Sequence, residues 1–211
     1  MPVLPYCVVL ASEGPKGDLT GVNGARVERL PVNDLCVFYS RMEEPGLSPE
    51  KLQSNALEFY GVVHSIFRSS AVVPFRFPAL LADEEHLREH VSGKARQYKN
   101  FLEETSGMAQ MEVRAPFPVL RARESPKSGT DYLRQQQSRV RETERVASAV
   151  QDKVKDVAGE WKHKPEGDHV RLYAKVPRSR IQEFRERLKQ DADSMGLKVS
   201  GPWPLSEFLP E

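Results

Sequence analysis

The sequence predicts an α+β protein with two domains, at residues 1–82 and 83–211. Strand-like and helix-like segments alternate along the chain, and after residue 107 they follow the order strand, helix, strand, helix, strand. This order favours a sandwich with helices on one face of a sheet, loosely ferredoxin-like, with an extended tail from about residue 200. A chain of 211 residues is long enough to bury its core without a disulfide or metal.

The first domain opens on strand-like segments. We expect strands at residues 4–11, 26–30, 35–41 and 72–77. Pro74 has no backbone donor, so the last strand should lie at a sheet edge or contain a bulge. Ser48 and Pro49 are typical of an N-cap and a first helical residue. The apolar residues that follow at helical spacing predict one buried helix face: Leu52, Ala56, Phe59, Val63, Ile66 and Phe67.

The second domain opens at Asp83, a good N-cap, and Gly107 is suited to end the helix that begins there. The expected buried face of this helix consists of Leu87, Val91, Ala95, Tyr98 and Leu102. A strand at 108–115, a long helix at 131–161, and strands at 169–176 and 198–200 are then predicted. Ser179 and Gln182 match a capping box for the last helix, which Gly196 should end.

The charge is balanced overall, with 31 Lys and Arg against 30 Asp and Glu and a formal net charge of +1. This balance argues against nucleic-acid binding and against a polybasic membrane-binding face. It is uneven along the chain, because residues 1–120 carry a net charge of −3 and residues 121–164 a net charge of +4. No apolar run is long enough to span a membrane, and the N-terminus has no basic region of the kind that opens a signal peptide. Cys7 and Cys36 lie in strand-like runs, and we expect buried thiols in a reducing cytoplasm.

Residues 86–90 match H-x-x-E-H, the inverted zinc-protease motif, which makes His86 and His90 weak candidate metal ligands. Glu160 or Glu166 would have to supply the third ligand, and no pattern marks either of them. Leu87 and Val91 occupy the buried face of the same helix and leave the histidines largely toward solvent. We therefore favour a solvated helix face with no metal, no cofactor and no catalytic residue.

Apolar residues recur every seven positions along the long helix, and this pattern has two explanations. The seam contains Leu133, Val140, Ala147, Val154 and Trp161. Either a partner helix packs on it in a coiled coil, or the helix lies across the sheet of its own domain, which we favour. The basic residues near the start of the helix would meet an acidic partner in the first case and solvent in the second.

The tail, residues 200–211, contains three prolines and is too apolar for an unanchored terminus. Either it packs back onto the body of the protein, which we favour, or Trp203, Leu205 and Phe208 contact a partner.

Four segments in order along the chain resemble the gas vesicle protein F/L (GvpF/GvpL) family. They are Val73-Pro-Phe-Arg-Phe77 followed by Asp83–Arg88, Gly107 with Met111–Arg114, Ser128-Gly-Thr-Asp-Tyr-Leu133, and Ser200-Gly-Pro-Trp-Pro204 with Phe208. The chain departs from the family pattern at Pro78, where glycine is usual, at Gln135, where arginine is usual, and at Leu205-Ser-Glu207 in the tail. These departures leave the fold in place and bear on the partner contact.

The resemblance implies a non-enzymatic gas vesicle accessory protein of the cytoplasm, associated with the vesicle. Members of the family have an N-terminal α+β domain and a C-terminal modified ferredoxin-like domain. They are thought to bind the small hydrophobic shell protein, to act with other accessory proteins, and to assist nucleation and assembly. Trp203, Leu205, Phe208, Arg76 and Phe77 lie in the matching segments and are the candidate partner-binding residues. The alternatives are a zinc-dependent hydrolase and a general protein-binding module outside gas vesicles.

Overall fold

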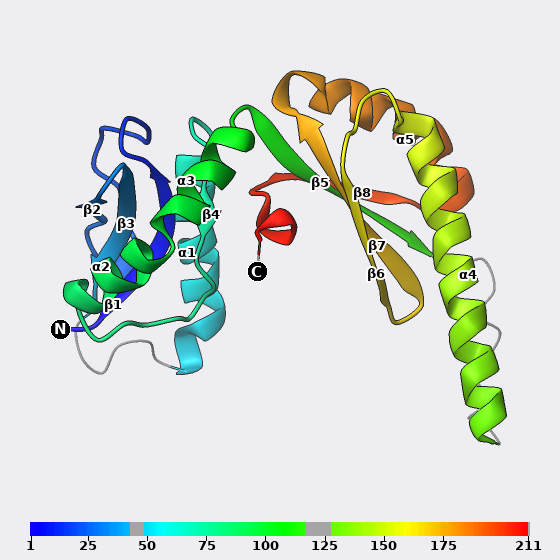
Figure 1. Cartoon of the computed structure of the whole chain (residues 1–211), viewed down its shortest axis with the longest axis horizontal. Coiled ribbons are helices and arrows are strands. Elements are labelled where there is room, and N and C mark those ends of the chain that lie inside the picture. The colour runs from blue at the N-terminus through cyan, green and yellow to red at the C-terminus, as the bar shows by residue number, and fades with distance from the viewer. Residues whose placement is uncertain (43–48, 117–127, 211) are drawn as a thin grey trace. The chain divides into compact units, whose positions relative to one another are not determined.

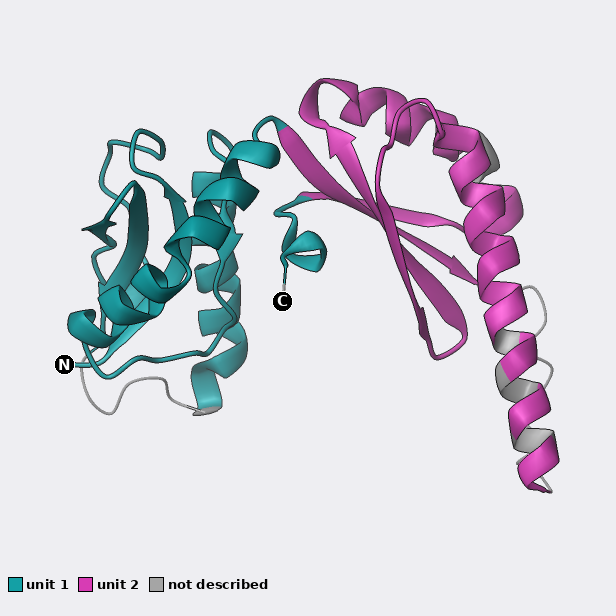
Figure 2. Ribbon diagram, viewed as in Figure 1, with its two compact units in different colours: residues 1–107, 203–211 teal, residues 108–202 magenta. Residues whose placement is uncertain are grey.

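The computed structural model describes residues 1–42, 49–116 and 128–210, and the chain forms two compact units. Unit 1 contains residues Met1–Gly107 and Trp203–Glu211, and unit 2 contains Met108–Pro202 (Figure 2). The first division therefore falls after Gly107, whereas the sequence led us to place it after residue 82. The tail, which we expected to belong to the second domain, is grouped with unit 1.

The sheet of unit 1 has four strands in the order β2-β3-β1-β4, and its neighbours pair antiparallel (Figure 1). The strands are β1 (Val3–Leu10), β2 (Glu28–Val32), β3 (Leu35–Arg41) and β4 (Val73–Pro74). Each of the four predicted segments overlaps one of these strands. Pro74 lies in the edge strand β4, as its missing donor predicted.

Helices cover both faces of this sheet. Ser40 faces Tyr6, whose ring centroid lies 5.1 Å from that of Phe59 on α1 (Leu52–Phe67). The next residue, Arg41, points to the other face and donates from Nε to the Glu84 carboxylate, at 2.8 Å, where α2 (Glu84–Gly93) begins. Because α2 and the following α3 (Ala95–Glu104) both contact β1, residues 83–107 belong to unit 1.

The predicted helix from Asp83 to Gly107 is two helices, which meet at Lys94 (φ −115°, ψ 9°). Its start is confirmed, since the Asp83 carboxylate accepts the backbone N–H of His86 at 3.0 Å. Gly107 has φ +72°, a conformation that glycine adopts without strain after a helix. Of the expected buried face, three residues are fully buried: Leu87, Val91 and Leu102. In the preceding helix Leu52 is exposed although we expected it to be buried, and the predicted N-cap Ser48 lies outside the described residues.

The Tyr6 hydroxyl holds the glycine-rich loop against the sheet. It donates to Ser40 Oγ at 3.0 Å and accepts the backbone N–H of Val22, also at 3.0 Å, while Ser40 Oγ donates to the Arg26 carbonyl. A Cβ at Gly21 would collide with the Tyr6 hydroxyl and with Ser40 Oγ, so only glycine allows this close approach. One buried hydroxyl therefore joins β1, β3 and the loop between β1 and β2.

Cys7 and Cys36 lie on the neighbouring strands β1 and β3, and both are buried and unbridged, as the sequence predicted. Burial raises the pKa of the Cys7 thiol far above its ordinary value, so this thiol stays protonated. It behaves as a small core residue.

The sheet of unit 2 has the strand order β6-β7-β5-β8, and β7 pairs antiparallel with both β5 and β6. Its strands are β5 (Met108–Pro116), β6 (Trp161–Glu166), β7 (His169–Pro177) and β8 (Lys198–Trp203). Strand β6 was not predicted from the sequence, which instead indicated a helix up to Trp161. Its pairing begins just before the strand, since Gly159 N–H donates to the Lys175 carbonyl and Lys175 N–H to the Glu160 carbonyl.

The long helix α4 (Gly129–Val154) ends seven residues before the predicted end, because the chain there turns into the hairpin of β6 and β7. The last helix, α5 (Ile181–Met195), follows a short 3-10 turn at Arg178–Arg180. Ser179 lies inside that turn, which has no side-chain cap, and Gln182 donates to Glu186 instead. The predicted capping box is therefore wrong, whereas the predicted end at Gly196 (φ +63°) is confirmed.

Both helices of unit 2 pack on one face of its sheet. The C-terminal half of α4 buries Ala147, Val150 and Val154 in the same cluster as Phe184 and Leu188 of α5. Leu133, in the N-terminal half, is 61% exposed. The favoured explanation of the seven-residue pattern, packing on the domain's own sheet, thus holds for the C-terminal half of the helix. In the described part of the chain, no helix has the length and apolar character needed to cross a membrane.

Replacing Tyr6 by Phe should lower the free energy of unfolding by about 1–3 kcal/mol, because the buried N–H of Val22 loses its acceptor. Urea unfolding followed by circular dichroism measures this change. Tyr60→Phe is the matched control, since the same hydroxyl is removed from a side chain that is 56% exposed. It should leave the value within about 0.5 kcal/mol, and an equal loss in both variants would contradict the proposed role of Tyr6.

Leu188→Ala should cost about 2–5 kcal/mol, because it opens a cavity where α5 meets the sheet of unit 2. Leu133→Ala removes the same atoms from an exposed position on α4 and should have little effect. Thermal unfolding of the two variants compares them directly. A large loss in Leu133→Ala would show that the outer half of α4 is covered in the isolated protein.

Candidate functional site

The C-terminal tail packs onto the chain's own body, as the sequence analysis favoured. Leu205 and Phe208 are buried, and a 3-10 turn spans Ser206–Phe208. The Gln97 side-chain amide donates to the Pro210 carbonyl at 3.4 Å, which ties the end of the tail to α3 of unit 1. Burial removes Leu205 and Phe208 from the surface, so of the three tail candidates Trp203, at 43% exposed, keeps the most surface for a partner.

Trp203 continues an exposed apolar strip on α1. Its ring centroid lies 6.4 Å from that of His64, and Leu57, Tyr60 and His64 follow the i, i+3, i+7 spacing of one helix face. Leu57 is 71% and Tyr60 is 56% exposed. We call Leu57, Tyr60, His64 and Trp203 the α1 strip. It is an apolar and aromatic surface of unit 1 made from two segments distant in sequence.

The α1 strip rests on a fixed aromatic cluster around Phe59, which is fully buried. The Phe59 ring centroid lies 5.1 Å from that of Tyr6, 5.4 Å from Tyr60 in an edge-on arrangement, and 5.4 Å from Phe77. Aromatic pairs at these separations favour defined geometries. The cluster therefore orients Tyr60 and also places Phe77, a sequence-predicted site residue, beside the same helix. Its neighbour Arg76 is exposed.

Gly61 lies within the exposed side of α1, and a Cβ built on it would meet open space. A helix or strand of a partner can therefore approach the α1 backbone closely at this point. Leu57 and Tyr60 were not among the predicted site residues, because they lie outside the stripe of α1 that was expected to face the core. The signal was present, since the helix carries more large apolar residues than one buried face requires.

His86 and His90 do not form a metal cluster in the structure. His86 Nδ1 lies 2.7 Å from Asp83 Oδ1, and the His90 ring centroid lies 5.8 Å from that of Phe75. The suggested third ligand Glu166 forms an ion pair with Arg171 in unit 2, and its Oε2 lies 3.4 Å from His169 Nε2. Among the residues that the structure describes, no three His, Cys, Asp or Glu side chains gather in a way that would hold a metal ion.

Asp83 and His86 shift each other's pKa in opposite directions. The pKa of Asp83 is lowered, first by the backbone N–H of His86 and then by the His86 side chain, and the pKa of His86 is raised by its hydrogen bond to Asp83. Both groups are exposed, and their interaction is a helix cap with a charged partner. This arrangement gives His86 a local role at the start of α2.

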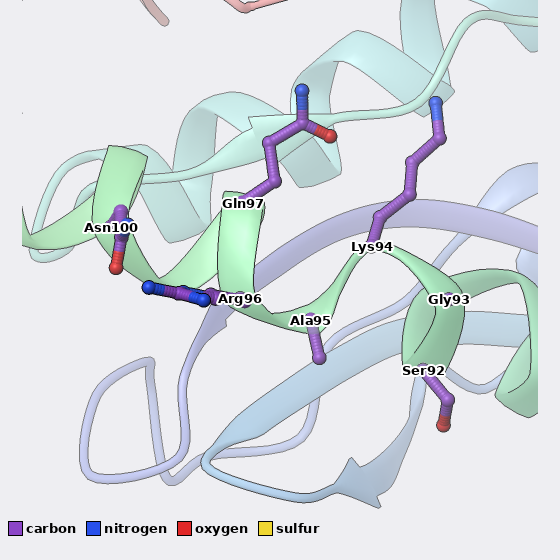
Figure 3. A pocket seen from close by; sticks show the side chains of 7 residues that line it. All are labelled: Ser92, Gly93, Lys94, Ala95, Arg96, Gln97 and Asn100. Carbon is purple, nitrogen blue, oxygen red and sulfur yellow. The ribbon is translucent and has the colours of Figure 1, made fainter.

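A hollow of about 390 Å³ lies where α2 meets α3, lined by Ser92, Gly93, Lys94, Ala95, Arg96, Gln97 and Asn100. Figure 3 shows that its polar side chains do not converge: Lys94 and Gln97 extend to one side, and Ser92 to the other. A binding pocket for a small molecule needs polar groups aimed at a common point. This hollow lacks that geometry.

The profile of the gas vesicle synthesis protein GvpL/GvpF family matches residues 3–210 of the chain. The chain belongs to this family. The resemblance inferred from four ordered motifs is thereby confirmed, and it indicates a role in gas vesicles. The GvpL/GvpF family is a family of gas vesicle proteins rather than a class of enzymes.

Two solved structures share the fold of this GvpL/GvpF protein over its whole length. GvpF from Anabaena sp. PCC7120 has a TM-score of 0.79 and 11% identity, with coverage of 100% of this chain and 96% of that chain. GvpF from Microcystis aeruginosa has a TM-score of 0.78 and 13% identity, with coverage of 100% and 99%. At such low identity these matches establish the mixed α and β fold alone. No curated protein sequence matches the chain.

The shifts at Asp83 and His86 predict a pH window for the α2 cap of this GvpL/GvpF protein. The contribution of Asp83, whose pKa is lowered, is present above its unfolded-state pKa and is lost as pH falls through the folded value. The contribution of His86, whose pKa is raised, is present below its unfolded-state pKa and is lost as pH rises through the folded value. Both contributions to stability are therefore fully present at a pH between the ordinary pKa values of the two groups, 3.8 for Asp83 and 6.5 for His86.

Asp83→Ala should return the pKa of His86 toward its ordinary value, as measured by NMR titration of the imidazole. Asp83→Asn is the matched control, because an asparagine still caps the helix but lacks the charge. It should also lower the pKa of His86 while preserving more of the thermal stability. A His86 pKa that stays the same in both variants would refute the pairing.

Proposed function

We propose that this protein is an accessory protein of gas vesicle assembly that binds the hydrophobic shell protein, acts with other accessory proteins and catalyses no reaction. The observation that carries this proposal is the GvpL/GvpF profile match over residues 3–210. On this proposal the protein works in the cytoplasm, associated with the vesicle. A partner-binding role also fits the α1 strip, where the large apolar side chains of Leu57, Tyr60 and Trp203 are exposed.

The two compact units are, on this proposal, the two domains of the family, with unit 2 as the modified ferredoxin-like one. Its elements run in the order β5-α4-β6-β7-α5-β8, and its strands lie in the order β6-β7-β5-β8. A split βαβ arrangement with two helices on one face has this order, which supports the assignment.

The α1 strip is the proposed contact for the shell protein, with Arg76 and Phe77 beside it. A very hydrophobic partner gains most from a surface where large apolar side chains are already exposed. Trp203 and Tyr60 have few rotatable bonds, so ordering them on binding costs little entropy. Leu205 and Phe208 would support the contact indirectly, since their burial holds the tail that carries Trp203.

Co-expression with the shell protein of the same organism tests this proposal. The tagged chain should co-purify with shell protein and keep it out of aggregates, and Tyr60→Ala with Trp203→Ala should reduce the recovered shell protein about tenfold, equivalent to about 1.4 kcal/mol of binding. The matched control is Leu133→Ala with Val140→Ala, which removes two exposed apolar side chains from α4.

The outcomes separate the site from the function. Equal loss in the control pair would remove the α1 strip as the contact but leave the assembly role. No co-purification with the unmodified chain would overturn the shell-binding function itself. A stoichiometric zinc ion, found by elemental analysis and lost in His86→Ala, would instead support the hydrolase alternative.

A further inference from the structure

The sheet of unit 2 has one face packed against helices and one face that is polar. Residues of β5 and β7 alternate, so that Met111, Val113 and Ala115 share the cluster formed by α4 and α5. The intervening residues therefore point to the opposite face. Its charged members on the three neighbouring strands β5, β7 and β6 are Glu112, Arg114, Arg171, Lys175, Lys162, Lys164 and Glu166.

The register of these strands places three cations in one row. Arg114 of β5 lies directly opposite Arg171 of β7, and Arg171 lies directly opposite Lys164 of β6. The adjacent row is Glu112, Tyr173 and Lys162, and the Lys164 ammonium lies 5.9 Å from the centroid of the Tyr173 ring. We call Arg114, Arg171 and Lys164 the cation row.

Two carboxylates on this face pair with the two arginines of the row. Glu112 Oε1 lies 2.7 Å from Arg114 Nε and 3.8 Å from Arg171 Nε, and Glu166 also pairs with Arg171. Lys175 Nζ lies 4.0 Å from Oε2 of Glu160, a residue that precedes β6. The face still carries five cations against its own two carboxylates.

Protection of a sheet edge explains only part of this pattern. Lysines on an edge strand hinder pairing with another sheet, and Lys162 and Lys164 lie on the edge strand β6. Arg114 and Arg171, however, lie on the inner strands β5 and β7, whose neighbours on both sides are already paired. Edge protection does not require a cation there, whereas an anionic ligand lying across the strands would contact all three.

We propose that this polar face binds an acidic segment of a partner protein, with its carboxylates over the cation row. Arginine forms paired hydrogen bonds with a carboxylate, and the neighbouring lysines add attraction of longer range. A nucleic acid is disfavoured because the whole chain has a net charge of only +1, whereas proteins that bind a phosphate backbone are strongly basic. This polar face is a second surface, for a class of partner other than the shell protein. Only the placing of that partner among gas vesicle proteins rests on the proposed assembly role.

Fluorescence anisotropy with a labelled oligoglutamate peptide tests the proposal on the full chain. The unmodified protein should bind the peptide at low ionic strength and release it as salt is added. Arg114→Gln with Lys164→Gln should weaken binding about tenfold or more, because two of the three cations in the row are lost. The matched control, Arg145→Gln with Lys189→Gln, makes the same change in net charge on exposed residues of α4 and α5 and should bind like the unmodified protein.

Three results would overturn the proposal. They are the absence of peptide binding, equal weakening of binding in the control pair, and tighter binding of a single-stranded RNA of equal charge. The last result would assign the face to phosphates.

Lys164→Gln alone should not lower the melting temperature, so weaker binding in that variant would not reflect unfolding. Co-purification with the shell protein should survive Arg114→Gln with Lys164→Gln. Failure of peptide binding thus remains distinguishable from failure of the shell-binding function.

Discussion

Burial of β1 and β3 on both faces is the constraint on which unit 1 depends. Consecutive residues of a strand point to opposite faces, so two strands that are buried along their length need cover on both sides. Helix α1 supplies it on one side, and α2 with α3 supplies it on the other. This requirement joins residues 83–107 to the first unit. It also fixes α1 through Phe59, and thereby orients the exposed residues Leu57 and Tyr60 on the outside of the same helix.

Unit 2 meets the same requirement differently. Its helices cover one face of the sheet, and charged side chains occupy the other. A one-sided sheet does not need an apolar second face, so charges there are tolerated, and cross-strand register decides which of them become neighbours. The result is a polar face with a surplus of cations in a chain whose overall charge is nearly neutral. The uneven charge along the sequence, positive between residues 121 and 164, therefore has a partial structural counterpart in β6.

On the two proposals, the α1 strip and the cation row bind partners by different physical means. The α1 strip offers apolar area, which suits a hydrophobic shell protein, and the cation row offers directed charge, which suits an acidic segment.

The departures from the family pattern in the tail include a buried residue. Leu205 lies among them and is buried, so the change affects how the tail is anchored and leaves Trp203 exposed beside His64.

The sequence alone determined the features that depend on a few adjacent residues. Asp83 as an N-cap, Gly107 and Gly196 as helix ends and Pro74 at a sheet edge follow from local backbone chemistry, and four ordered motifs identified the family. Tertiary structure decided what depends on contacts between distant segments. Pairing with β7 made a strand of Trp161–Glu166, although Trp161 continues the seven-residue spacing of the preceding helix. Packing of α2 and α3 against β1 places residues 83–107 in unit 1. The α1 strip and the cation row are of the same kind: each joins residues far apart in sequence, and no local pattern encodes which strand register or which returning tail brings them together.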